Sequence, residues 1–139
     1  MTTSPSGRVL IVDDDAAIRT LVQNIFRRSG YVVEAAEDGA QAIDRFETDR
    51  YDVIILDLMM PVVNGFEVLE WMQKSRPGES ENCVIVLTAA AQRDLKQLDG
   101  DSVYAVIRKP FDLEELLNTV SQCVQHSALA GEPRAVSQG

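Results

Sequence analysis

The sequence predicts an α/β fold in which helices cover both faces of a parallel β-sheet. Short apolar runs rich in β-branched residues recur along the chain, and each has the length of a strand that is buried on both faces. Amphipathic helical patterns lie between these runs, so that strand and helix signals alternate five times. One domain is expected, because 139 residues, of which 45% are hydrophobic, can form a single core of ordinary size.

Four of the apolar runs are followed by polar residues suited to phosphate chemistry. The runs are 9–12, 53–56, 84–87 and 105–108, and the residues that follow them are Asp13, Asp57, Thr88 and Lys109. The carboxyl ends of parallel strands share one edge of the sheet, and open α/β sheets bind ligands at that edge. We therefore expect these side chains to form one site.

The first half of the chain also predicts two helices and a further strand. Asp15 is the expected N-cap of a helix over 16–28, and Gly30 is its expected C-terminal cap. A strand is expected over 31–35, and Asp38 then opens a second helix with a pair like a capping box. The predicted inward residues are Ile18, Leu21, Val22, Ile25 and Phe26 in the first helix and Ile43 and Phe46 in the second.

The second half predicts three more helices. A loop over 58–64 leads to a helix that begins at Gly65, and residues 75–82 predict a polar loop around Pro77-Gly78. A fourth helix is expected over 89–98, and Asp112 caps the last helix. The predicted inward residues are Phe66, Leu69 and Met72 in the third helix, and Leu113, Leu116, Leu117, Val120 and Val124 in the last.

Composition disfavours two classes of partner. The formal net charge of −9 disfavours nucleic acid and anionic membrane surfaces as direct partners. The sequence has no internal repeat, no long apolar span and no N-terminal signal pattern, which predicts a soluble cytoplasmic protein without membrane insertion.

The domain is expected over 8–126, between flexible tails over 1–7 and 127–139. Cys83 and Cys123 are expected as buried free thiols and His126 as a surface residue.

Asp57 is the candidate nucleophile of the predicted site. An ionised carboxylate needs no general base, and aspartyl phosphates are known covalent intermediates. A lone aspartate is more often a helix cap or a turn residue, but Asp57 follows a central strand between two other polar strand ends. Asp13 and Asp14 are the candidate metal ligands, because crowded carboxylates repel by roughly 4 kcal/mol per close pair and a divalent cation relieves that repulsion.

Lys109 and Thr88 are the candidate phosphate-binding residues. The Lys109 ammonium can act as a point charge on a phosphoryl oxygen, or pair with Asp57. The Thr88 hydroxyl can donate a hydrogen bond to such an oxygen, although a threonine at a strand end is common without this role. Ala89 is small and leaves room for the phosphate.

These motifs resemble the receiver domain of bacterial two-component response regulators, over roughly residues 8–125. The matching pieces are Val12-Asp13-Asp14, Asp57 with Met60-Pro61 and Gly65 after it, Thr88-Ala89, and Lys109-Pro110-Phe111. The resemblance implies a doubly wound, flavodoxin-like (βα)5 fold, a three-layer sandwich with strand order 2-1-3-4-5. It also implies a cis peptide bond before Pro110.

The resemblance further implies a signalling switch rather than an enzyme with a separate substrate. Asp57 would accept a phosphoryl group from a phosphohistidine on a sensor histidine kinase or a histidine phosphotransfer protein, with Mg²⁺ or Mn²⁺. Asp14 and Asp57 would bind the cation directly, Asp13 through water, and the backbone carbonyl of Met59 would complete the protein ligands. Thr88 would then move toward the phosphate and change the face formed by the fourth helix, the fifth strand and the fifth helix. An unidentified downstream protein would read this face, and the chain would be a monomer before phosphorylation.

Two features depart from the usual receiver pattern. The position three residues before Lys109, where many receivers carry an aromatic residue, holds Val106, and Tyr104 two residues earlier is the candidate switch aromatic. Met59 and Ala90, which in the family line the approach of the hydrolytic water, are both apolar. We therefore expect a long-lived aspartyl phosphate.

Other functions remain as alternatives. A hydrolase of the haloacid dehalogenase type would need a second acid two residues after Asp57, where this chain has Met59. A flavin-binding module would need a phosphate loop where Asp13 begins an acidic run, which repels phosphate. The chain could also be a receiver fragment of a larger response regulator, or a degenerate receiver that only mediates contacts.

Overall fold

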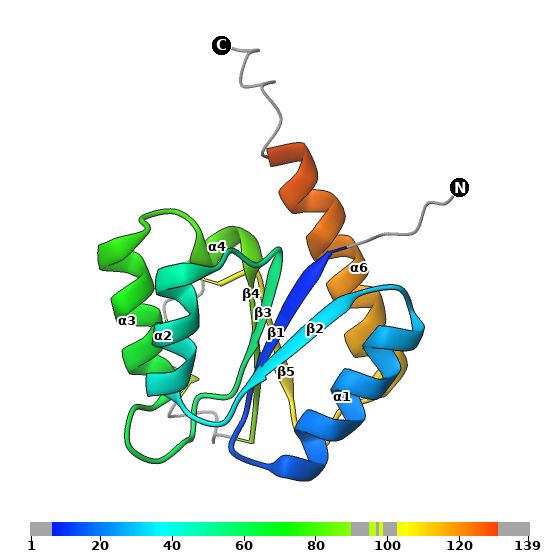
Figure 1. Cartoon of the computed structure of the whole chain (residues 1–139), viewed down its shortest axis with the longest axis horizontal. Helices are drawn as coiled ribbons and strands as arrows, with labels where there is room; N and C mark the ends of the chain where they lie inside the picture. Colours follow the sequence, from blue (N-terminus) through cyan, green and yellow to red (C-terminus); the bar gives the residue numbers. More distant parts are fainter. Residues whose placement is uncertain (1–6, 90–94, 97, 99–102, 131–139) are drawn as a thin grey trace.

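A five-stranded parallel sheet forms the centre of the computed structural model, which describes residues 7–89, 95–96, 98 and 103–130 (Figure 1). The strands lie in the order β2-β1-β3-β4-β5, which confirms the predicted class and strand order. They are β1 (Arg8–Val12), β2 (Val32–Ala36), β3 (Val53–Leu56), β4 (Val84–Thr88) and β5 (Ala105–Arg108). Because every neighbouring pair is parallel, the carboxyl ends of all five strands lie at one edge.

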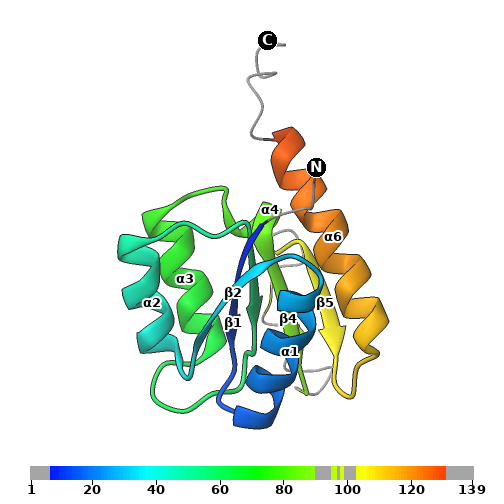
Figure 2. The same cartoon turned by 45° about the vertical axis from the view of Figure 1, so that its right-hand side comes forward.

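Helices cover both faces of the sheet and complete a three-layer sandwich. As Figures 1 and 2 show, α2 and α3 lie on one face, and α1 and α6 lie on the other. The described helices are α1 (Ala16–Arg28), α2 (Gly39–Thr48), α3 (Gly65–Ser75), α4 (Ser80–Cys83) and α6 (Leu113–Ala130). Each described helix is too short or too polar to cross a membrane.

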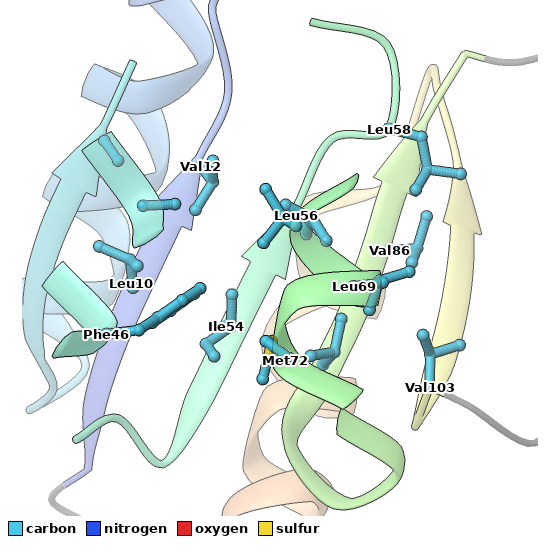
Figure 3. Packing of buried hydrophobic residues seen from close by; sticks show 14 of the residues in the cluster. Leu10, Val12, Phe46, Ile54, Leu56, Leu58, Leu69, Met72, Val86 and Val103 are labelled. Atoms are coloured by element: carbon cyan, nitrogen blue, oxygen red, sulfur yellow. The ribbon is translucent and has the colours of Figure 1, made fainter. Parts of the chain in front are cut away.

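The alternation of side chains along the strands divides the core into two clusters. Leu10 packs with Phe46 of α2 and Met72 of α3, and Figure 3 shows this cluster against the sheet. Val9, the preceding residue, packs on the opposite face with Phe26 of α1. Full burial of one such side chain stabilises the fold by about 1.5–3 kcal/mol. The apolar runs therefore hold both helical layers in place.

Side-chain caps define where the helices that follow the strands begin. The Asp15 side chain accepts a hydrogen bond from the Ala17 N–H at 2.9 Å, and Asp38 accepts one from the Gln41 N–H at the same distance, as predicted. The side chain of Asn64 forms a full capping box at the start of α3, which the sequence analysis did not anticipate. These caps place the first turn of each helix beside the carboxyl edge of the sheet.

Three local predictions were wrong. The strand expected from Tyr31 begins at Val32, because the Tyr31 N–H donates to the Phe26 carbonyl and closes the end of α1. The loop expected over 75–82 is shorter, because Ser75 ends α3 and the single helical turn of α4 begins at Ser80. Leu21, assigned to the inward stripe of α1, is 43% exposed, because only one narrow side of α1, with Val22 and Phe26, is fully buried against the sheet.

The remaining differences concern the ends of helices. The last helix continues to Ala130, beyond the predicted domain end at residue 126. Most of the helix expected over 89–98 lies outside the described residues, but Leu95 and Leu98 are described and pack against the cluster under α2 and α3. Cys83 and Cys123 are buried free thiols, as predicted.

Val62, in the loop between β3 and α3, has an unfavourable backbone conformation. Its φ angle is 68°, in the left-handed region that a β-branched residue rarely adopts, and its side chain is 83% exposed. Asparagine tolerates this region more easily. We expect Val62→Asn to raise the free energy of unfolding by about 1 kcal/mol, measured by urea denaturation. Val62→Ala should raise it less, and an Asn variant no more stable than the wild type would contradict the strain argument.

Candidate functional site

Four strand ends bring the predicted site residues to one edge of the sheet. The Asp57 N–H donates to the Val12 carbonyl at 2.9 Å, and the Lys109 N–H donates to the Thr88 carbonyl at 2.9 Å. These bonds continue the ladders of β1–β3 and β4–β5 beyond the strands themselves. The backbone of the sheet therefore fixes the positions from which the side chains project.

Three carboxylates form the centre of the site. Asp13, Asp14 and Asp57 each place a carboxylate oxygen so that all three oxygens lie within 4.8 Å of one another. Asp13 is fully buried and Asp57 is 4% exposed, whereas Asp14 is open to solvent. At this distance and an effective dielectric constant near 20, two like charges repel by about 3 kcal/mol. The cluster therefore needs a compensating positive charge.

Lys109 supplies part of that charge. Its ammonium nitrogen lies 3.0 Å from Asp13 Oδ2 and 3.5 Å from Asp57 Oδ2. Burial lowers the pKa of Lys109, but the hydrogen bond to Asp13 and the charges of Asp13 and Asp57 outweigh this effect, so its pKa is raised above the usual value. The lysine therefore stays protonated and bridges the carboxylates of β1 and β3.

Asp57 has a raised pKa despite this neighbour. The net pKa of its carboxyl is about 6. Burial is the largest cause and raises it, the hydrogen bond from the Met59 N–H to Asp57 Oδ1 at 3.1 Å lowers it, and the charges of Asp13 and Asp14 raise it further against the lowering effect of Lys109. At neutral pH the carboxylate is mostly ionised but poorly solvated. Such a group gains from a cation or another electrostatic partner at its free oxygen.

The donor set fits a divalent cation of the magnesium type. Carboxylate oxygens are the ligands that Mg²⁺ and Mn²⁺ prefer, and exposed Asp14 can reach a cation that keeps several of its waters. Three carboxylates against one ammonium leave the cluster with excess negative charge. The residues present therefore fit such an ion.

Two glycines position the loop that follows Asp57, and the sequence analysis assigned neither a reason. A Cβ atom at Gly65 would lie 2.4 Å from the Asp57 carbonyl oxygen, and one at Gly39 would lie 2.3 Å from the Val63 carbonyl oxygen. Only glycine lets α3 approach the peptide of Asp57, and α2 the loop, this closely. Gly65 was noted as part of the motif, but a single sequence carries no signal for either contact.

Arg19 is a third residue that the sequence analysis missed. From the first turns of α1, its guanidinium donates a hydrogen bond to the backbone carbonyl of Asp13 at 2.8 Å. A charged residue on an amphipathic helix is usually assigned to the solvated face, so the sequence alone offered no signal.

Of the other residues predicted for the site, some lie at the carboxyl edge of the sheet and Tyr104 does not. Thr88 is fully buried at the end of β4, exposed Ala89 follows it, and the Lys109–Pro110 bond is cis as expected. Tyr104 lies at the opposite end of β4, because its N–H donates to the carbonyl of Val84, the first residue of that strand. About four strand residues (~13 Å) therefore separate Tyr104 from Thr88.

The ring of Tyr104 packs 5.4 Å from that of exposed His126 on α6. Val106, in the usual aromatic position, is 40% exposed. The structure therefore does not bring Tyr104 to the acidic edge of the sheet. Ala90, the other residue expected near the site, lies outside the described residues.

The raised pKa of Asp57 predicts how stability depends on pH. The folded carboxyl binds a proton more tightly than the unfolded one, whose usual pKa is 3.8, so the folded state loses stability as pH rises from about 4 through about 6. Without divalent cations, Asp57→Asn should therefore raise the free energy of unfolding by about 1–3 kcal/mol at pH 8 and by much less at pH 4. Urea denaturation at both pH values measures this.

Asp44→Asn on the exposed side of α2 is the matched control and should show no such pH-dependent gain. An equal effect of Asp57→Asn at both pH values would show that burial of its charge does not limit stability.

Comparison with known proteins gives consistent results. The family model of the response regulator receiver domain matches residues 9–121. The chain is 37% identical over 114 residues to the response regulator MprA of Mycobacterium tuberculosis, which covers 81% of this chain and 48% of that protein. The chain thus spans about half the length of the curated relatives it matches.

Solved structures agree with this result. The CheY-like receiver domain protein from Methanospirillum hungatei is 28% identical, with a TM-score of 0.82 over 91% of this chain and 100% of that one. The response regulator TrrA from Thermotoga maritima, solved in complex with Mg²⁺ and BeF, is 31% identical, with a TM-score of 0.72 over 84% of this chain and 97% of that one. The order of the strands, the acidic cluster at their carboxyl ends and these matches lead to one conclusion: the chain belongs to the family of response regulator receiver domains.

Proposed function

We propose that this chain is a phosphoacceptor switch in which Asp57 receives a phosphoryl group from a phosphohistidine. The donor is a sensor histidine kinase or a histidine phosphotransfer protein. The observation that carries the proposal is the buried Asp57 carboxylate, which has two further carboxylates within 4.8 Å and the Lys109 ammonium at 3.5 Å. Among the described residues this is the one group of carboxylates close enough to hold a metal ion.

The transfer step needs an ionised acceptor and compensation for negative charge. An oxygen of Asp57 attacks the phosphorus and the phosphorus–nitrogen bond of the phosphohistidine breaks. The other ring nitrogen carries a proton taken from solvent, so that the imidazole leaves as neutral histidine. No base is needed, because Asp57 has a pKa of about 6 and is mostly ionised at pH 7. Lys109, 3.5 Å from Asp57 Oδ2, then contacts a phosphoryl oxygen.

A divalent cation belongs to this proposal. Asp14, Asp57 and the backbone carbonyl of Met59 would hold Mg²⁺ or Mn²⁺ directly, and Asp13 would act through water. When bound, the cation neutralises charge on the carboxylates and on the transferring phosphoryl group. The presence of Mg²⁺ and BeF in the related TrrA structure supports this assignment.

Thr88 and Lys109 together convert the phosphate into a conformational change. Moving a two-state equilibrium from mostly off to mostly on takes about 5.5 kcal/mol, whereas one hydrogen bond to a charged group contributes about 1.5–3 kcal/mol. The Thr88 hydroxyl and Ala89 would move toward the phosphate at the end of β4, and Lys109 would exchange Asp13 for a phosphoryl oxygen. Both contacts are needed, or the partner supplies the rest.

The output is a change in protein binding. The face that includes β5 and α6 would change and alter contact with a downstream protein, while the chain itself has no separate substrate. We place it in the cytoplasm, as a monomer before phosphorylation. Within a longer response regulator of the kind it matches, it would be the regulatory part, and its acidic surface makes direct contact of this domain with nucleic acid unfavourable.

Phosphorylation can be tested directly by intact mass. After incubation with Mg²⁺ and acetyl phosphate, the wild type should gain one phosphoryl group, and chelation of the metal should abolish the gain. Asp57→Ala and Asp57→Asn should gain none, because the nucleophile is missing.

Asp15→Asn is the matched control, since Asp15 belongs to the same acidic run but caps α1. It should be phosphorylated like the wild type. If neither acetyl phosphate nor a cognate kinase phosphorylates the wild type, the chain is a receiver that only mediates contacts.

Met59 predicts a slow return to the resting state. Its side chain is 53% exposed beside the site and offers no group that can orient or deprotonate a water molecule. We expect the purified phosphoprotein to decay over minutes or longer, measured by mass spectrometry after donor removal. Met59→Asn should shorten the half-life and Met59→Leu should not; a wild-type half-life of seconds would rule the idea out.

A further inference from the structure

We propose that Arg19 is a positioning residue that holds the turn between β1 and α1, so that Asp14 points its carboxylate at the cation; this rests on the proposed function. Its Nη1 donates to the backbone carbonyl of Asp13 at 2.8 Å in a partly buried position. That carbonyl belongs to the peptide bond that joins Asp13 to Asp14. The arginine therefore fixes the orientation of the backbone from which the Asp14 side chain starts.

The rest of the turn is held around this bond. The Asp13 N–H donates to the Ala36 carbonyl at 3.2 Å. Asp13 Oδ1 accepts from the Asp15 N–H at 2.9 Å, and Oδ2 accepts from Lys109 at 3.0 Å. Asp13 is thus fixed through its N–H, its carbonyl and both carboxylate oxygens. Asp14, which follows it, is the exposed member of the acidic cluster and depends on this frame for its direction.

Arg19 could act through its charge or through its hydrogen bond, and the two roles predict opposite results. A cation held close to the acidic cluster repels Mg²⁺, so removal of the charge alone would strengthen metal binding. A donor that orients the turn improves metal binding, and its loss would weaken it, as with other groups that orient metal ligands. The geometry points to the second role, because the guanidinium bonds the carbonyl and not a carboxylate.

The same helix offers a matched control. Arg27, near the other end of α1, donates from Nη2 to the backbone carbonyl of Val33 at 3.3 Å. In both hydrogen bonds the arginine and the carbonyl that it contacts are six residues apart in the sequence, and both bonds are partly buried. Val33 lies in β2 and belongs to no part of the acidic site. Loss of the Arg27 bond therefore costs stability without altering the metal ligands.

The experiment compares Mg²⁺ binding by Arg19→Met, Arg19→Lys and Arg27→Met in the full chain. The readouts are the Mg²⁺-dependent rise in melting temperature and the Mg²⁺ concentration that gives half the maximal rate of phosphorylation by acetyl phosphate. Arg19→Met should need about tenfold more Mg²⁺ in both assays. Saturating Mg²⁺ should restore most of the rate, and Arg19→Lys, which keeps one donor, should recover part of the affinity.

Arg27→Met should lower the melting temperature and leave the Mg²⁺ dependence unchanged. Unchanged or tighter Mg²⁺ binding by Arg19→Met would overturn the proposal; if that variant does not fold, Arg19→Leu, which also lacks a donor, takes its place under the same criterion. The thermal titration needs no phosphorylation. A wild type that binds Mg²⁺ but accepts no phosphoryl group would therefore refute the proposed function and still test Arg19.

Discussion

The contacts of Lys109 with two buried carboxylates are the interaction on which this structure most depends. Asp13 and Asp57 are almost completely buried, lie close enough to repel and come from different strands. The ammonium lies 3.0 Å from one and 3.5 Å from the other, and it projects from just beyond β5 at the edge of the sheet. One lysine thus joins the ends of three strands while leaving the cluster with excess negative charge. The remaining negative charge favours the binding of a cation at this edge of the sheet.

The backbone around these charges leaves little freedom to relax. Gly65 lets α3 pack directly on the peptide of Asp57. Gly39 lets α2 pack equally closely on Val63, in the loop between β3 and α3. Arg19 holds the carbonyl of Asp13 from the opposite helical layer. Val62 keeps a left-handed conformation in the same loop. Repulsion between the carboxylates is therefore resisted by close packing, and a cation can bind at the site without first having to order it.

Tyr104 separates this chain from receivers that couple the phosphate to an aromatic residue in the fifth strand. It lies near the start of β4, with its ring beside His126 of α6, while Thr88 and Lys109 lie at the far end of their strands. Val106 takes the usual aromatic position and is partly exposed. The ring of Tyr104 is therefore remote from Thr88 and from the acidic cluster at the carboxyl edge of the sheet.

The sequence by itself determined the fold class, the place of each strand to within one residue and the grouping of acidic residues at one edge of the sheet. This was possible because apolar runs buried on both faces mark parallel strands, and because parallel strands bring their carboxyl ends together whatever helices lie between them. Asp13, Asp57 and Lys109 could be assigned from those two facts.

Only the tertiary structure decided that Lys109 lies closer to Asp13 than to Asp57, and that Gly39 and Gly65 have no room for a side chain. It also decided that Arg19 turns toward Asp13 and that Tyr104 lies away from the acidic site. These features depend on distances between segments that are far apart in the sequence or on the rotamer of one side chain. Periodicity and spacing carry no information about either.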